Sequence, residues 1–144
     1  MKNIKTIVLD TSVIIKPLLK EHGGEIVKKI IYLKENFELS ILVPDIFRYE
    51  FMNTIGRELD TGIAEDAFMA FTERQVSIIP LALDLIKKAF EITNKYPKVS
   101  FYDAVYHALA KAYNADFITA DHRYYEQTKK EGNIKLLEDL KLPA

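Results

Sequence analysis

The hydrophobic positions along the chain fall into two alternating patterns. Short unbroken apolar runs, typical of strands buried on both faces of a sheet, lie at 4–9, 39–43, 76–79, 116–119 and 134–137. Longer stretches with apolar residues at helical spacing predict helices at 12–20, 25–36, 45–59, 63–75, 82–95, 101–113 and 122–130. Strands that alternate with helices predict an α/β fold, a three-layer sandwich with a central, mostly parallel sheet of four to five strands flanked by helices.

The length of 144 residues suits one domain with a hydrophobic core, and no linker, repeat or low-complexity segment interrupts the pattern. We therefore expect a single domain over residues 1–144. No apolar run is long enough to cross a membrane, and the first residues lack the apolar core of a signal peptide. The expected location is the cytoplasm.

Composition removes several classes of chemistry. The chain has no cysteine, which excludes disulfides, thiol catalysis and thiolate metal sites. Its three histidines do not have the spacing of a zinc site, and its five glycines form neither a dinucleotide-binding nor a P-loop motif. The net charge of −1 argues against a protein that coats nucleic acid, but it permits an enzyme that contacts a few phosphates.

Two aspartates follow directly on predicted strands. Asp10 ends the run TIVL and Asp121 comes just after the run DFIT. Each precedes a predicted helix, so each is a good N-cap candidate, and a cap can also take part in a site. Parallel strands bring their carboxyl ends to one edge of a sheet, where ligands bind in this fold class. If the two strands are neighbours, the two carboxylates meet.

Two further acids have ordinary structural explanations. Asp103 stands three residues after Ser100, in the pattern of a capping box. Glu50 lies opposite the apolar face of the helix predicted at 45–59, and the local pattern favours a solvated position for it. His107 follows Asp103 by one helical turn, and an isolated histidine there is more often structural than catalytic.

Taken in order, these acids resemble the pattern of PIN-domain nucleases, specifically the VapC-like ribonuclease toxins of toxin–antitoxin pairs. The resemblance is carried by the segments LDTSV at 9–13, PDIFRYEFMN at 44–53, SFYDAVYHALA at 100–110 and ADFITAD at 115–121. These segments span most of the chain, and together they are specific although DTS alone is weak.

The resemblance implies that Asp10, Glu50, Asp103 and Asp121 line one acidic pocket that binds Mg²⁺ or Mn²⁺ and carries the catalysis. It also implies supporting roles for Ser12, Asn53 and Thr119, while Lys16 and Arg123 are candidates to bind substrate. Members often have another acid or amide after the last aspartate. This chain has His122 and Arg123 there, which puts a full second metal site in doubt.

The activity implied is hydrolysis of RNA to 5′-phosphate and 3′-hydroxyl ends by a metal-dependent endoribonuclease. A toxin of this family is expected to have an antitoxin protein as partner and to form a homodimer. Apolar residues beyond one face of the helices at 45–59 and 63–75, such as Met52 and Met69, are available for such an interface or for the core.

Three other functions stay open on the sequence. The chain could be a housekeeping RNA-processing nuclease of the same family rather than a toxin. It could be a catalytically silent binding module on the same fold, although the presence of all four acids argues against that. An aspartate-based phosphotransfer domain fits less well, because such enzymes have a second acid where this chain has Ser12.

Overall fold

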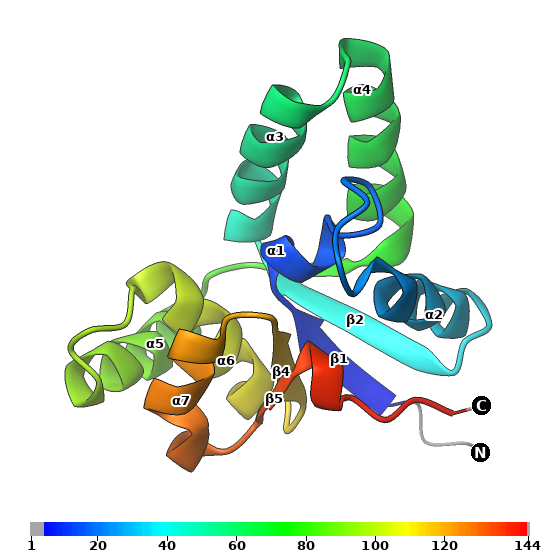
Figure 1. The fold of residues 1–144 in the computed structure, drawn as a ribbon. Helices are drawn as coiled ribbons and strands as arrows, with labels where there is room; N and C mark the ends of the chain where they lie inside the picture. Colours follow the sequence, from blue (N-terminus) through cyan, green and yellow to red (C-terminus); the bar gives the residue numbers. More distant parts are fainter. Residues whose placement is uncertain (1–4, 144) are drawn as a thin grey trace.

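The structure is a computed structural model that describes residues 5–143, and its centre is a five-stranded, fully parallel sheet (Figure 1). The strands lie in the order β3-β2-β1-β4-β5. They are β1 (Lys5–Leu9), β2 (Leu39–Pro44), β3 (Ser77–Ile79), β4 (Asp116–Thr119) and β5 (Ile134–Leu136). The predicted parallel sheet is confirmed; residue 4, predicted to begin the first strand, lies outside the described residues.

Helices cover both faces of this sheet. They are α1 (Thr11–Ile14), α2 (Gly24–Glu35), α3 (Ile46–Glu58), α4 (Thr61–Ala70), α5 (Leu83–Lys95), α6 (Phe101–Ala112) and α7 (His122–Thr128). Figure 1 shows α2 on one side of the sheet, α5, α6 and α7 on the other, and α3 and α4 projecting together as an arm. The expected three-layer α/β sandwich is confirmed. Within residues 5–143, no helix combines the length and apolarity needed to span a membrane.

The apolar runs form the core because both faces of the central strands are covered. Ile7, Val8 and Leu9 of β1 are at most 1% exposed. The strand packs beneath α6, whose residues 104–110 are all buried. Burying one such aliphatic side chain stabilises the fold by about 2 kcal/mol, so β1 is rigidly held up to its last residue.

Three local features differ from the prediction. The first helix ends at Ile14 rather than at residue 20, and Pro17, which has no backbone N–H to donate, follows in the turn. Helix α4 continues into a π-helical turn over Phe71–Gln75. Asp45, whose residue type and place at the start of the helix predicted at 45–59 favour an N-cap, does not cap α3; its carboxylate accepts a hydrogen bond from Leu81 N at 3.4 Å instead.

The strand order places a topological switch at β1. From β1 the chain crosses to β2 on one side, while β4 pairs with β1 on the other. Crossovers that diverge in this way open a crevice outside the carboxyl ends of the strands. Helices α1 and α3 begin at this edge, and α6 begins there too because it leads into the parallel strand β4.

Candidate active site

Asp10 is the first residue after β1 and lies at the switch. Its N–H donates to Ile118 O of β4 at 3.4 Å, which extends the β1–β4 ladder to this residue. Its Oδ1 accepts from Ser12 N at 3.4 Å and so caps α1. The cap interpretation is therefore confirmed, and the fixed backbone also aims the carboxylate at the sheet edge.

Asp121 lies beyond the end of the neighbouring strand. Its Oδ1 accepts a hydrogen bond from Tyr124 N at 3.0 Å and caps α7. Its own N–H donates to Thr119 Oγ1 at 3.0 Å, and Thr119 is buried at the end of β4. The buried threonine thus fixes the turn that carries the aspartate, and the pairing of β1 with β4 brings this turn to the same sheet edge as Asp10.

Asp103 stands in the first turn of α6. Its N–H donates to Ser100 Oγ at 3.1 Å, and the Ser100 hydroxyl donates to Asp103 Oδ2 at 3.1 Å. The predicted cap by Ser100 is confirmed. The capping contact holds Asp103 half-buried at the carboxyl edge of the sheet, where its charge interacts with those of Asp10 and Asp121.

Glu50 is not on a solvated face, contrary to the local pattern. It is half-buried, and its Oε1 accepts hydrogen bonds from Tyr106 OH at 2.6 Å and from Thr11 Oγ1 at 3.3 Å. The Thr11 and Tyr106 hydroxyls are themselves 2.7 Å apart. The first turns of α3 pack beside α1 at the sheet edge, so a position that is polar on the helix faces Thr11 and Tyr106.

Tyr106 is a contributor that the sequence did not reveal. Its aromatic ring is 1% exposed and packs on Phe117 with the ring centroids 5.8 Å apart, as a core residue would. Only the hydroxyl reaches the site. A tyrosine at a buried helical position can serve only to fill the core. The one sequence signal was the hydroxyl itself, because a phenylalanine would fill the core equally well.

The electrostatics of the site are those of crowded carboxylates. Burial, and then the charges of Asp103 and Glu50, raise the pKa of Asp10 from 3.8 to about 7, against hydrogen bonds from Ser12 that lower it. Burial also raises the pKa of Glu50, opposed by the Tyr106 and Thr11 hydrogen bonds. Burial and the charge of Asp121 raise the pKa of Asp103, opposed by Ser100.

No cation in the described chain offsets this repulsion. Within residues 5–143, no lysine or arginine forms an ion pair with Asp10, Glu50, Asp103 or Asp121. Their oxygens are the hard ligands that Mg²⁺ and Mn²⁺ prefer, so the donor set fits such an ion. As placed, however, no three Asp, Glu or His side chains of these residues are close enough to share one ion. Mg²⁺ commonly binds through one or two carboxylates and keeps several waters, so the fit does not need three.

The structure also places the remaining predicted residues, which are the candidates for supporting and substrate-binding roles. Ser12 is exposed next to Asp10, and Asn53 is exposed one turn after Glu50 on α3. Lys16 lines a pocket together with His122, between the segment that joins α1 to α2 and the segments that follow β4 and β5, while Arg123 is exposed at the start of α7.

His107 has the structural place expected of it. It is fully buried, with Nε2 2.8 Å from Gly132 O and Nδ1 2.9 Å from Tyr124 OH. A carbonyl only accepts, so Nε2 carries the hydrogen and Nδ1 accepts from the tyrosine. Burial lowers the pKa of His107, which keeps this neutral form.

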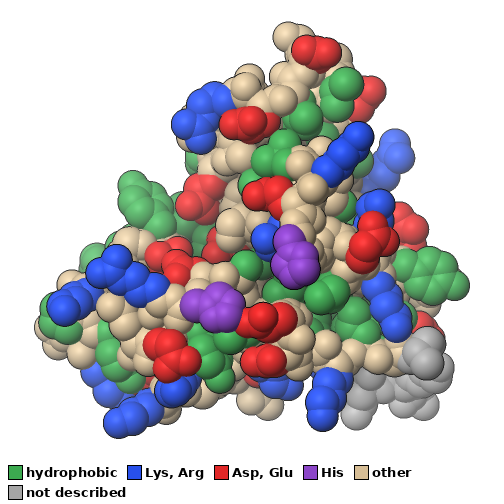
Figure 2. All heavy atoms as spheres, in the orientation of Figure 1, with side chains coloured by type: hydrophobic (Ala, Val, Ile, Leu, Met, Phe, Trp, Pro, Cys, Tyr) green, Lys and Arg blue, Asp and Glu red, His purple; other side chains and the backbone are tan. Residues whose placement is uncertain are grey.

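One face of the molecule shows the charge pattern around the arm. Figure 2 shows acidic side chains where the arm meets the body of the molecule, and two histidines on the same face. Because His107 is fully buried, these two are His22 and His122. Acidic side chains and exposed imidazoles therefore occur on one face of the molecule.

Comparison with known proteins agrees with this architecture. The family model described as "PIN domain" matches residues 7–130. By sequence, no curated protein matches the chain. Among solved structures, the chain is similar to a toxin–antitoxin complex from Klebsiella pneumoniae, with a TM-score of 0.70, 16% identity, and 93% of this chain and 99% of that chain covered.

Two further structures have the same fold. One is VapC20 of Mycobacterium tuberculosis, described as a sarcin–ricin loop cleaving toxin, with a TM-score of 0.65, 17% identity, and 88% of this chain and 95% of that chain covered. The other is VapBC2 of Rickettsia felis bound to a DNA fragment from its promoter, with a TM-score of 0.64, 14% identity, and 91% and 96% covered. At these identities the likeness concerns the fold.

Proposed function

The chain belongs to the PIN domain family, and on this premise we propose that it is a metal-dependent endoribonuclease that cuts RNA to 5′-phosphate and 3′-hydroxyl ends. The observation that carries the proposal is the group of carboxylates Asp10, Glu50, Asp103 and Asp121 at one sheet edge, where burial and neighbouring negative charges raise the pKa of the first three and no lysine or arginine of residues 5–143 pairs with them. Fixed groups held in an electrostatically unfavourable arrangement are typical of sites that bind or react.

Each residue has a defined task in this reaction. Asp10 and Asp103, which are held by caps on rigid elements, would bind Mg²⁺ or Mn²⁺, with Glu50 and Asp121 holding further coordinated waters. The bound ion would polarise the phosphodiester and neutralise the charge that develops on it. A water oxygen bonds to phosphorus and the bond to the 3′ oxygen breaks; in net terms the proton that the water loses ends on the 3′ oxygen, which leaves a 5′-phosphate and a 3′-hydroxyl. Lys16 and Arg123 are the cations proposed to bind flanking phosphates.

Within the family, we propose the role of a toxin that is restrained by an antitoxin protein. The support is the overall fold, which the chain shares with a toxin–antitoxin complex over 93% of its length. Exposed apolar side chains on the arm offer a surface for a protein partner, which we propose to be a second copy in a homodimer. Met52 is 39% exposed and Met69 56% exposed, whereas Phe71 belongs to the core. The expected location is the cytoplasm, where RNA is available.

The test is cleavage of RNA by Asp10→Asn and Asp103→Asn in Mg²⁺ or Mn²⁺. Both variants should lose at least about 100-fold in rate, and EDTA should abolish cleavage by the native chain. Asp66→Asn is the matched control, because Asp66 is an exposed aspartate on α4, away from the sheet edge. Full activity in both site variants, or in EDTA, would refute the proposal.

The same experiments separate the alternatives. A silent binding module would show neither cleavage nor binding of Mg²⁺ or Mn²⁺ by calorimetry. A phosphotransfer domain would form an aspartyl adduct with acetyl phosphate. A housekeeping nuclease would cleave RNA, but its production in cells would not arrest growth and no neighbouring gene product would neutralise it.

A further inference from the structure

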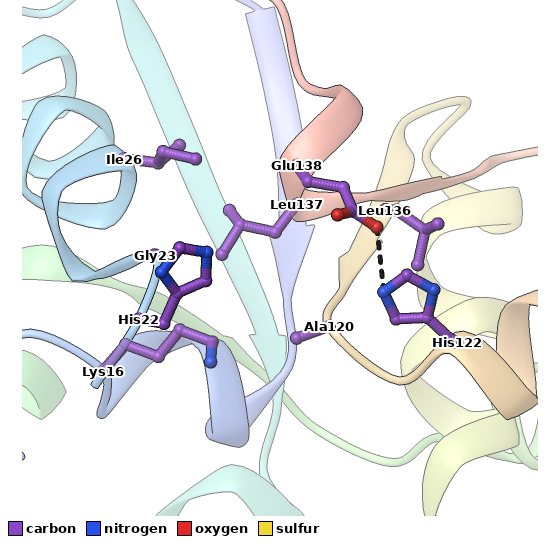
Figure 3. A pocket seen from close by; sticks show the side chains of 9 residues that line it. All are labelled: Lys16, His22, Gly23, Ile26, Ala120, His122, Leu136, Leu137 and Glu138. Atoms are coloured by element: carbon purple, nitrogen blue, oxygen red, sulfur yellow. Dashed lines mark ion pairs between the residues drawn. The ribbon is translucent and has the colours of Figure 1, made fainter.

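A pocket of about 170 Å³ opens beside the acidic edge. Its walls come from the turn after α1, the start of α2, the loop after β4 and the chain after β5 (Figure 3). The apolar lining consists of Ile26, Ala120, Leu136 and Leu137. Leu136 and Leu137 are mostly buried in the core, and Ile26 and Ala120 pack against it, so the floor of the pocket is the outer edge of the hydrophobic core.

Two imidazoles stand on opposite sides of this recess. In Figure 3, His22 lies beside Leu137 on one side and His122 lies on the other, with Ala120 between them. His122 Nε2 is 2.8 Å from Glu138 Oε1, and this contact fixes the ring at the pocket mouth. Aromatic faces next to an apolar floor are the means by which proteins bind unpaired bases of single-stranded nucleic acid.

The size of the pocket restricts the ligand. An apolar cavity of about 150 Å³ in another protein accommodates benzene, so a recess of this volume takes one six-membered ring. The polar groups at the rim are a donor, Lys16, and an acceptor, Glu138. A pyrimidine presents carbonyl oxygens and N–H groups around one such ring, which matches a donor and an acceptor at the rim.

The position of the pocket ties it to the carboxylates. Ala120, in the pocket wall, lies between Thr119 and Asp121, and His122 follows that aspartate directly. Lys16 comes from the turn that follows α1, the helix that Asp10 caps. A nucleotide next to one whose phosphodiester lies at the acidic edge would therefore place its base over this recess.

We propose that the pocket lined by His22, His122 and Leu137 binds one unpaired pyrimidine base of the RNA, next to the nucleotide that is cut. The RNA context rests on the proposed function, whereas recognition of the base itself does not. The pocket would then contribute to the choice of cleavage site by admitting a single ring and excluding a purine.

Binding of the base is tested without any cleavage, by proton NMR of the imidazole Cε1–H resonances. The native chain has three histidines, of which His22 and His122 line the pocket and His107 is fully buried and serves as an internal reference. Titration with cytidine and uridine should shift the two pocket resonances in a saturable manner and leave that of His107 in place. Adenosine should shift them at least about tenfold more weakly.

Inorganic phosphate and ribose are the control ligands. If phosphate alone reproduces the shifts, the recess is an anion site and the proposal is wrong. It is equally wrong if no nucleoside shifts either resonance, or if adenosine binds as well as the pyrimidines. Ile26→Trp should fill the pocket and abolish the shifts, whereas Tyr32→Trp, on the same helix but outside the pocket, should not.

Cleavage of a randomised RNA, followed by sequencing of the ends, gives the functional readout. The native chain and Tyr32→Trp should prefer a pyrimidine at one fixed position beside the cut, and Ile26→Trp should lose about tenfold of that preference. Cleavage without nucleoside binding would overturn the pocket and leave the nuclease. Nucleoside binding without any cleavage would overturn the nuclease and leave the pocket.

Discussion

Two groups of acidic side chains in this protein have opposite electrostatics. At the sheet edge, Asp10 lies among other carboxylates and its pKa is raised to about 7. Near the last turn of α6, Glu131 lies between Lys95 and Lys111 and accepts a hydrogen bond from Tyr96 at 2.9 Å. Hydrogen bonds from the two lysines lower the pKa of Glu131 to about 2.

The difference separates an acid that the chain itself neutralises from one that lies among like charges. Glu131 has every partner it needs within the chain, and its side chain is only 8% exposed, so it joins α5, α6 and the turn after α7. Asp10 has only the Ser12 hydrogen bonds against burial and two like charges. Such an arrangement costs folding free energy, and it becomes favourable only when a cation enters from outside.

The largest expected effect is that substitutions at Asp10 and Glu131 have opposite consequences: the first reduces activity and the second reduces stability. Asp10→Asn should reduce RNA cleavage by about 100-fold or more and leave the metal-free protein as stable as the native chain, or more so, because it removes repulsion. Glu131→Gln should keep cleavage within about twofold and lose about 1–3 kcal/mol of stability. Rates of RNA cleavage and urea denaturation in EDTA measure the two quantities. The comparison fails if both variants lose activity alike.

A smaller effect concerns stabilisation by the ion itself. Adding Mg²⁺ or Mn²⁺ at about 100 times its dissociation constant should stabilise the native chain by about 2.7 kcal/mol, because binding favours the folded state. Glu131→Gln should gain the same free energy of unfolding from the ion, although it is less stable than the native chain without it. Asp10→Asn and Asp103→Asn should gain little. Thermal denaturation with and without the ion shows this, and an equal gain in all four proteins would place the cation elsewhere.

The sequence predicted the strand that carries Asp10 better than it predicted the surroundings of Glu50. Ile7, Val8 and Leu9, followed by Asp10, predict a buried strand with an acid at its end, because burial and backbone geometry there depend only on nearby residues. Glu50 was misplaced by its helical pattern because its burial comes from contacts with Thr11 of α1 and Tyr106 of α6, which are tertiary contacts.

Two other features needed the folded chain for similar reasons. The hydroxyl of Tyr106 reaches Glu50 across 56 positions of sequence, and no local pattern encodes such a contact. The pocket between His22 and His122 joins two turns that lie far apart in sequence. Long-range contacts of this kind arise from the packing of whole elements, which periodicity does not describe.

The two acids should also respond to pH with opposite sign. Glu131 has a folded pKa of about 2, below its ordinary 4.5, so its contribution to stability is present above pH 4.5 and disappears as the pH falls towards 2. Asp10 has a folded pKa of about 7, above 3.8, so the metal-free protein loses stability as the pH rises from 3.8 to 7.

Urea denaturation of the native chain and both variants across this range measures the effect. The difference between the native chain and Glu131→Gln should shrink by about 1–2 kcal/mol on acidification. The difference between the native chain and Asp10→Asn should change in favour of the variant as the pH rises to 7, when EDTA is present. Parallel pH profiles for the three proteins would contradict the assignment of opposite environments.

The smallest expected effect tests whether Tyr106 belongs to the acidic edge or only to the core. Tyr106→Phe keeps the ring against Phe117 but removes the hydroxyl that lies 2.6 Å from Glu50 Oε1 and 2.7 Å from Thr11 Oγ1. Glu50 then keeps only the Thr11 bond of 3.3 Å, and its carboxylate is held less firmly. We expect kcat to fall about tenfold, equivalent to about 1.4 kcal/mol, with KM for RNA unchanged. Tyr124→Phe is the matched control, since that hydroxyl is bound to His107 Nδ1 rather than to an acid. An equal fall in kcat for both variants would assign the loss to core packing, because of the two tyrosines Tyr106 donates to Glu50 and Tyr124 does not.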